Sequence, residues 1–210
     1  MLEKLKHILR IEPQEKTPNI SEKIDNLFSF LDEETIRIEI GDDIVPFNKN
    51  VCKTIDNVRQ ELTEELGFIL PVVRILNNIY LQENEYTIKI ENNLMHNGFV
   101  IPNEEGIEEE IYENLKNVLL NNMHMLLTNE LTEKYIESVR SKNSIMVWDI
   151  TGAISTTEIR IILGDLLEKG KSIKNISKIF EKISEQIYVQ NRNDYRNPHK
   201  LAEEIVKQLY

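Results

Sequence analysis

The sequence predicts an α+β protein in which an N-terminal β-α-β-β lobe precedes a helical region of helical hairpins. Apolar and charged residues alternate over residues 36–40, which is typical of a half-buried strand. Apolar residues then recur at helical spacing over residues 51–66, and alternation returns over residues 86–90. From residue 107 onward the apolar repeats have mainly helical spacing, so the second half is expected to be helical.

Residues 1–34 are expected to form two short helices joined by a linker. The apolar face of the first helix consists of Leu2, Leu5, Ile8 and Leu9. Residues 12–19 contain two prolines among polar residues, which is typical of a flexible tether. Ser21 is placed to cap a second helix, whose apolar face begins at Ile24.

Residues 35–103 are expected to form the β-α-β-β lobe. Gly41 ends the first strand, and a helix follows from about Val51. Gly67 lies where a left-handed residue would end that helix, because glycine adopts positive φ without steric cost. The lobe helix is therefore predicted to stop at residue 66.

Two further strands complete the predicted lobe. The second spans residues 72–76, and a turn at residues 83–84 is expected to make a hairpin with the third strand at residues 86–90. Residues 94–101 follow another turn and receive no assignment from the pattern.

Residues 104–210 are expected to form the helical region. Its first helix is predicted to start near Ile107 with three glutamates, residues 108–110, in the first turn, where carboxylates oppose the positive end of the helix dipole. This capping arrangement explains the glutamates better than a metal site does. Thr128 or the following asparagine is placed to cap the next helix.

The later part of the helical region contains two clear helix signals. Ser155 and Glu158 have the spacing of a capping box, and Gly170 is placed to end that helix. Ser172 is then expected to cap another helix. The apolar run at residues 145–148 could be a strand or a buried connection, because four residues are too few for periodicity to decide.

Composition argues against several functional classes. The net charge of -11 argues against nucleic-acid binding, which needs clustered lysine and arginine, and it also argues against a DNA-binding helix pair around Gly170. Cys52 is the single cysteine, so no internal disulfide can form, and a buried small side chain is the expectation. No apolar run reaches the length needed to span a bilayer. These features suit a cytoplasmic protein with protein partners.

The sequence gives no positive sign of an enzyme, a metal site or a cofactor. The histidines are scattered, without zinc-ligand spacing, at His7, His96, His124 and His199. The glycines are isolated and form no phosphate-binding loop. Asp42 and Asp43 follow a strand, but they are more typical of a turn than of catalysis. We therefore expect no catalytic, metal-binding or cofactor-binding residues.

Several short motifs resemble, in the right order, the cytoplasmic domain of the FlhA/InvA/LcrD (FHIPEP) family of type III export-gate proteins. They are RIEIG at 37–41, VP at 45–46, VRQELTEELGF at 58–68, PVVRI at 71–75 and NEY at 84–86. The helix pair from Ile154 to Ile176 resembles the third cytoplasmic subdomain of the same family.

The resemblance implies a non-catalytic domain that binds export components or chaperone–cargo complexes and forms a homo-oligomer, usually a nine-membered ring. It also implies a cytoplasmic location, at the inner face of the cell membrane if the domain is peripheral. Compared with typical members, the chain lacks the membrane region, a lobe inserted after Pro102 and a C-terminal end. A reduced stand-alone paralogue with a scaffold or regulatory role is the alternative, and an enzyme with an unrecognised site is less favoured.

The family resemblance and the predicted turns together suggest candidate contact residues. Leu5 and Ile8 are candidates because the family segment at this position reaches a neighbouring subunit, although packing on its own domain is the simpler expectation. Phe47, Phe68, Tyr80 and Phe99 lie near predicted turns. Each is more typical of a core residue, but Phe68 and Phe99 are taken as possible partner contacts. The candidate oligomer contacts are Glu158, Arg160 and Lys174.

Overall fold

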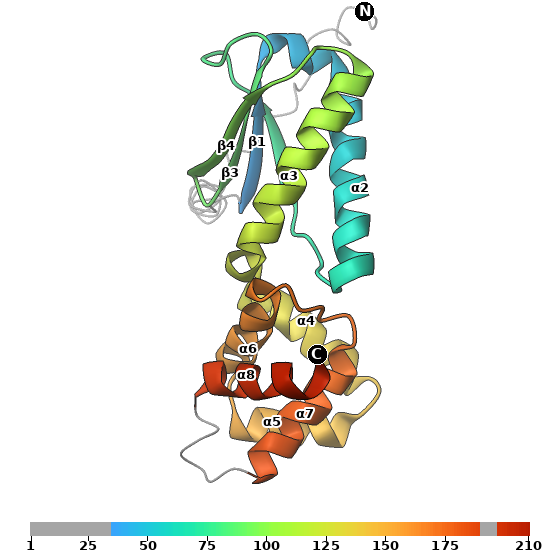
Figure 1. The fold of residues 1–210 in the computed structure, drawn as a ribbon, viewed down its shortest axis with the longest axis vertical. Coiled ribbons are helices and arrows are strands. Elements are labelled where there is room, and N and C mark those ends of the chain that lie inside the picture. Colours follow the sequence, from blue (N-terminus) through green and yellow to red (C-terminus); the bar gives the residue numbers. More distant parts are fainter. Residues whose placement is uncertain (1–34, 190–196) are drawn as a thin grey trace, which may run out of the picture. The chain divides into compact units, whose positions relative to one another are not determined.

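The structure is a computed structural model that describes residues 35–189 and 197–210 (Figure 1). Leu5, Ile8 and the expected helices of residues 1–34 lie outside the described residues. The described residues all belong to one compact unit. No helix within the described parts is both long and apolar enough to cross a membrane.

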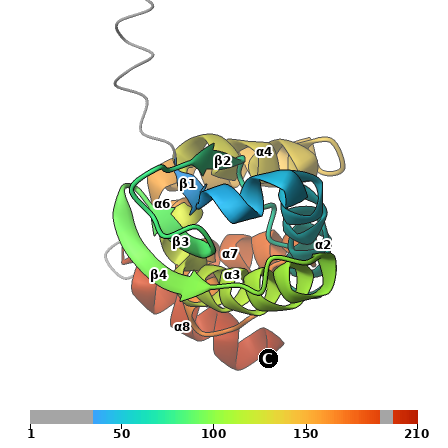
Figure 2. The same cartoon turned by 90° about the horizontal axis from the view of Figure 1, so that it is seen from above.

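The lobe contains a four-stranded mixed sheet with the order β2-β1-β3-β4. The central strand β1 (Ile36–Ile40) pairs in parallel with β2 (Val73–Asn77) and antiparallel with β3 (Glu85–Ile90). Strand β4 (Asn93–Phe99) pairs antiparallel with β3 (Figure 2). The α+β class and the order of lobe and helical region are as the sequence predicts.

Two details of the predicted lobe are wrong. The predicted hairpin between β2 and β3 does not exist, because these strands lie on opposite sides of β1. The true hairpin joins β3 to β4 through Glu91 and Asn92, both of which have positive φ. The unassigned stretch from residue 94 is therefore mostly a fourth strand, which turns the expected three-stranded lobe into a four-stranded one.

Helices α2 (Asn48–Leu66) and α3 (Glu104–Leu126) pack against each other beside the sheet (Figures 1 and 2). The β1 residues Ile36, Ile38 and Ile40 are buried in the core that these helices share. Each buried isoleucine contributes about 1.5–3 kcal/mol relative to an exposed one. The alternation correctly identifies the apolar face of β1, but Glu39 on the opposite face is also buried, so the prediction of a half-buried strand is wrong.

The helix ends in the lobe are set by specific residues. A short 3-10 helix (Asp42–Phe47) leads into α2, and α2 ends at Gly67, which has a φ of 72° as predicted. The α3 helix begins at Glu104, earlier than predicted, because the Asn103 side chain accepts a hydrogen bond from the Gly106 amide. The three glutamates after residue 107 are therefore not the cap.

The helical region contains five further helices within the described residues. They are α4 (Asn129–Arg140), α5 (Ser144–Ala153), α6 (Thr156–Glu168), α7 (Ile176–Val189) and α8 (Pro198–Leu209). The caps predicted at Thr128 and at the Ser155–Glu158 capping box are confirmed, and Gly170 has positive φ just beyond α6.

Two predictions in the helical region are wrong. Residues 145–148 are neither a strand nor a buried connection but the start of α5, which the Asn143 side chain caps. The helix expected after Ser172 begins only at Ile176. The reason is a tertiary contact, since the Ile173 amide donates to the Leu66 carbonyl at the end of α2 instead of starting a helix.

The lobe and the helical region share one continuous hydrophobic core. Tyr135 on α4 joins them directly, because its hydroxyl donates to the Gly67 carbonyl and accepts from the Ile69 amide. Burial raises the pKa of Tyr135 to about 12. The boundary between the lobe and the helical region at residue 103 stays a prediction, because α3, which begins after it, packs both on α2 of the lobe and on α6.

Candidate protein-interaction surfaces

One edge of the sheet gathers three connections. Strands β1, β2 and β4 end at this edge and β3 begins there, because β1 is parallel to β2 and both β1 and β4 are antiparallel to β3. The connections are therefore residues 41–47, 78–84 and 100–103. Segments that are far apart in the sequence meet at one end of the lobe.

This edge exposes a group of large apolar side chains, which we call the strand-end surface. Its members are Val45, Ile79, Tyr80, Phe99 and Ile101. Tyr80 is 91% exposed, and Ile79 and Ile101 are each at least 70% exposed. Single exposed apolar residues are common, but a group of this kind is typical of a protein-interaction site.

Backbone hydrogen bonds hold the connections of the strand-end surface in place. The amides of Gly41 and Asp43 donate to the carbonyls of Glu85 and Glu83 at 2.8 Å, and the Val100 amide donates to the Asn84 carbonyl at 3.0 Å. A side chain at residue 41 would place its Cβ 2.0 Å from the carbonyl oxygen of Gln82. The exposed side chains therefore project from an ordered backbone and not from loose loops.

The charges around the strand-end surface are mostly acidic, and Lys49 at the start of α2 is the exposed basic residue beside them. The charged residues of segments 41–47, 78–84 and 100–105 are Asp42, Asp43, Glu83, Glu104 and Glu105. All five are exposed. An apolar centre with an acidic surround favours a partner that presents apolar and basic side chains together.

A second exposed apolar group lies on the helical region, and we call it the α5 surface. It consists of Ile145 and Trp148, each 75% exposed, and Tyr188 on α7, which is 71% exposed. Arg140 and Ser144 join the two α5 residues around a shallow hollow of about 360 Å³. A hydrogen bond to Asp149 raises the pKa of Tyr188 and connects it to α5.

The structure separates the candidate partner contacts that the sequence suggested. Phe99 is 49% exposed and belongs to the strand-end surface. Phe68 is fully buried in the hydrophobic core, as the preferred core interpretation predicts, so its side chain is not an exposed partner contact. Tyr80, expected to be a core residue, is almost completely exposed.

Two of the three candidate oligomer contacts form hydrogen bonds within the chain. Glu158 forms the capping box with Ser155, and the Lys174 side chain donates to the Glu64 carbonyl at 2.8 Å. Arg160 is half-buried on α6. The structure brings none of these three residues into the strand-end surface, and their role as oligomer contacts stays a prediction.

Sequence reasoning missed most of the exposed apolar groups. Ile79 and Ile101 lie in connections whose geometry depends on a sheet order that the pattern did not reveal. Trp148 was placed in a strand or buried connection, whereas it lies on the outer side of a helix. Cys52 is also exposed on α2, so the expectation that it is buried is wrong.

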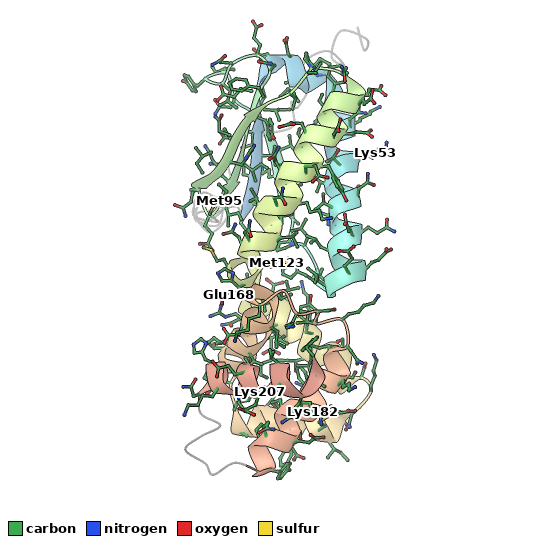
Figure 3. The ribbon with its side chains drawn as sticks, in the orientation of Figure 1. Lys53, Met95, Met123, Glu168, Lys182 and Lys207 are labelled. Carbon is green, nitrogen blue, oxygen red and sulfur yellow. The ribbon has the colours of Figure 1, made fainter. Side chains whose placement is uncertain are left out.

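The ionisable clusters hold elements together. Burial alone would raise the pKa of Glu39, but hydrogen bonds from Lys89 and Asn78 outweigh it and lower the pKa. On the helices, Glu108 joins α3 to α2 by accepting from Asn50 and from Lys53, which is labelled in Figure 3. Glu108 therefore joins two helices and does not form the predicted cap at the start of α3.

No group of acidic, histidine and cysteine side chains suited to a metal ion occurs within the described residues. The features present are exposed apolar surfaces on a rigid lobe and a helical region, together with carboxylates already engaged in structural bonds. They define the chain as an α+β domain whose surface is suited to contacts with proteins.

The chain belongs to the FHIPEP family, whose model matches residues 3–110 and 106–210. The two matched segments meet at the start of α3, where we expected a lobe of the typical family member to be absent. The flagellar biosynthesis protein FlhA of Bacillus subtilis is 23% identical over 212 aligned residues. That match covers 77% of this chain but 31% of the relative, so the chain spans about a third of its length.

Solved structures share the fold. Chlamydia pneumoniae CdsV, alone and in complex with CdsO, matches with a TM-score of 0.73 at 16% identity. These matches cover 84% of this chain and 66% or 65% of CdsV. The nonameric SctV-C of EPEC matches with a TM-score of 0.69 at 14% identity, covering 84% of this chain and 66% of that one. The chain thus has the fold of the cytoplasmic domains of export-gate proteins.

Proposed function

We propose that this chain is a non-catalytic interaction domain of a bacterial flagellar or virulence type III export gate. It binds export components on the cytoplasmic side of the membrane and associates with copies of itself. Family membership and similarity to FlhA support the export role. The strand-end surface is the observation that carries the binding proposal, because it presents several large apolar side chains on an ordered backbone.

The charge of the surface defines the partner further. Every charged residue in the three connections is acidic, as are the first two residues of α3, and Lys49 at the start of α2 is the basic exception. The partner is therefore an export component, either alone or as a chaperone–cargo complex, that presents an apolar anchor flanked by lysine or arginine. The apolar contact supplies the affinity, and the surrounding charges orient the encounter.

Self-association is supported by the nonameric assembly of SctV-C, which shares the fold. The CdsV–CdsO complex supports protein partners for domains of this kind. Light scattering on the full chain tests the first point, since the proposal requires a mass greater than that of one chain. A monomer over the whole accessible concentration range would contradict it.

The binding proposal is tested by titrating the full chain with purified chaperone–cargo complexes of the same export system in a calorimeter. Tyr80→Ser removes the most exposed aromatic side chain of the strand-end surface. We expect its affinity to fall about tenfold or more, as for an aromatic anchor at the centre of an interface. Trp148→Ser is the control, because it removes a largely exposed aromatic residue from the α5 surface.

Trp148→Ser is expected to bind as the unchanged chain does. Because Tyr80 and Trp148 are both exposed, neither substitution should alter folding, and circular dichroism checks this directly. Unchanged affinity of Tyr80→Ser, or an equal loss in both variants, would show that the strand-end surface is not the binding site.

A further inference from the structure

A groove in the helical region has the opposite charge character to the rest of the chain. It lies where the start of α7 meets the end of α8 and has a volume of about 490 Å³. Lys174, Asn175 and Lys178 line one side, and Leu209 and Tyr210 line the other. Among the described residues, no aspartate or glutamate side chain lines this lysine groove. That is unusual for a chain with a net charge of -11.

The lysines around the groove are not neutralised by the chain itself. Lys171, Lys174 and Lys178 form no ion pair with any carboxylate of the described residues. Nearby lysines outside the groove differ, because Lys182 pairs with Glu185 and Lys207 pairs with Glu204 (Figure 3). The lysines that line the groove therefore carry positive charge that no carboxylate of the described residues pairs.

The walls of the groove are fixed by contacts within the chain. The Tyr210 hydroxyl donates to the Ser172 carbonyl, and the Lys171 ammonium lies 5.4 Å from the centre of the Tyr210 ring. On the other side, the Lys174 ammonium donates to a backbone carbonyl, which holds its charge in place without cancelling it. The half-buried side chain of Leu209 provides an apolar patch in the same groove.

We propose that the lysine groove binds an acidic segment of a partner protein. Its carboxylates approach Lys174 and Lys178, and an apolar side chain beside them packs on Leu209. The charge complementarity selects acidic chains, and the apolar patch favours a peptide over a bare anion. This site is separate from the strand-end surface, whose acidic surround selects the opposite partner charge.

The test uses the full chain and a short labelled peptide that carries Glu and Leu at helical spacing. Fluorescence anisotropy measures binding to the unchanged chain, to Lys178→Gln and to Lys182→Gln. Both variants remove one lysine from the same helix, but only Lys178 lines the groove. We expect Lys178→Gln to weaken binding about fivefold and Lys182→Gln to leave it unchanged, as for the loss of one partly exposed charge contact.

Three results would overturn the proposal. The first is equal binding of the peptide in which Lys replaces each Glu. The second is an equal effect of the two substitutions. The third is preferential binding of a DNA duplex of similar charge, which would assign the groove to phosphate and not to an acidic protein segment. Raising the salt concentration should weaken the specific binding, because the contacts with the exposed lysines are screened.

Discussion

Gly67 serves two purposes at one position. It ends α2 with a φ of 72°, which residues with a side chain rarely adopt. It also lies against the loop before α7, where a Cβ would come within 2.5 Å of the backbone of Lys174. The first purpose could be predicted from local spacing. The second could not, because the neighbouring loop comes from a distant part of the chain.

Gly67→Ala should therefore lower the free energy of unfolding. We expect a loss of about 2 kcal/mol or more, since the substitution adds backbone strain and a contact with a backbone that cannot move freely. Chemical denaturation measures the change. Gly152→Ala is the control, because its Cβ would meet nothing within 4 Å in helix α5.

The control should stabilise the chain by roughly 0.5–1 kcal/mol, because alanine has a higher helix propensity than glycine. A Gly67→Ala variant as stable as the unchanged chain would mean that the loop before α7 does not pack closely on the end of α2.

At the scale of elements, the helix signals that depend on neighbours in the sequence are predicted well. The Ser155–Glu158 capping box and the end of α2 are examples. The failures occur where a tertiary contact decides, as at Ile173, whose amide bonds to α2. The order of the strands also could not be read from alternation, because a period of two identifies a buried face but not the neighbouring strand.

The junction between α2 and α4 gives a direct test of this packing. Tyr135→Phe removes the hydroxyl that bonds to both Gly67 and Ile69, leaving a partly buried amide and carbonyl with one partner fewer. We expect a loss of about 1–3 kcal/mol in the free energy of unfolding, measured by denaturation near neutral pH. Tyr188→Phe, on an exposed residue, should leave the denaturation midpoint nearly unchanged.

The same variant should change the response to alkaline pH. The pKa of Tyr135 is about 12 in the folded chain, above the value near 10 of an unfolded tyrosine. The stability that this shift contributes is fully present below about pH 10 and is lost as the pH rises toward 12. The free energy of unfolding of the Tyr135→Phe variant should therefore fall less steeply between pH 10 and 12 than that of the unchanged chain. An equally steep fall in both would contradict the burial of Tyr135.

At the scale of the whole molecule, the fold could be predicted from the sequence, but most of the exposed apolar surfaces could not. The α+β class and the family follow from short motifs and from periodicity, both of which are local. The strand-end surface depends on three connections that meet only because of the sheet order, so Phe99 was the one member proposed as a contact from sequence. The acidic residues around this surface could not be recognised as one group from the sequence, because they lie on connections that are far apart along the chain.

Hydrogen exchange by mass spectrometry, with and without a purified chaperone–cargo complex of the same export system, tests the central proposal most directly. We predict that the complex slows exchange in residues 78–84 and 99–103, because bound protein excludes water from the strand-end surface. Residues 144–148 of the α5 surface should exchange at the same rate in both samples. Protection confined to the helical region, or no protection at saturating complex, would contradict the proposal.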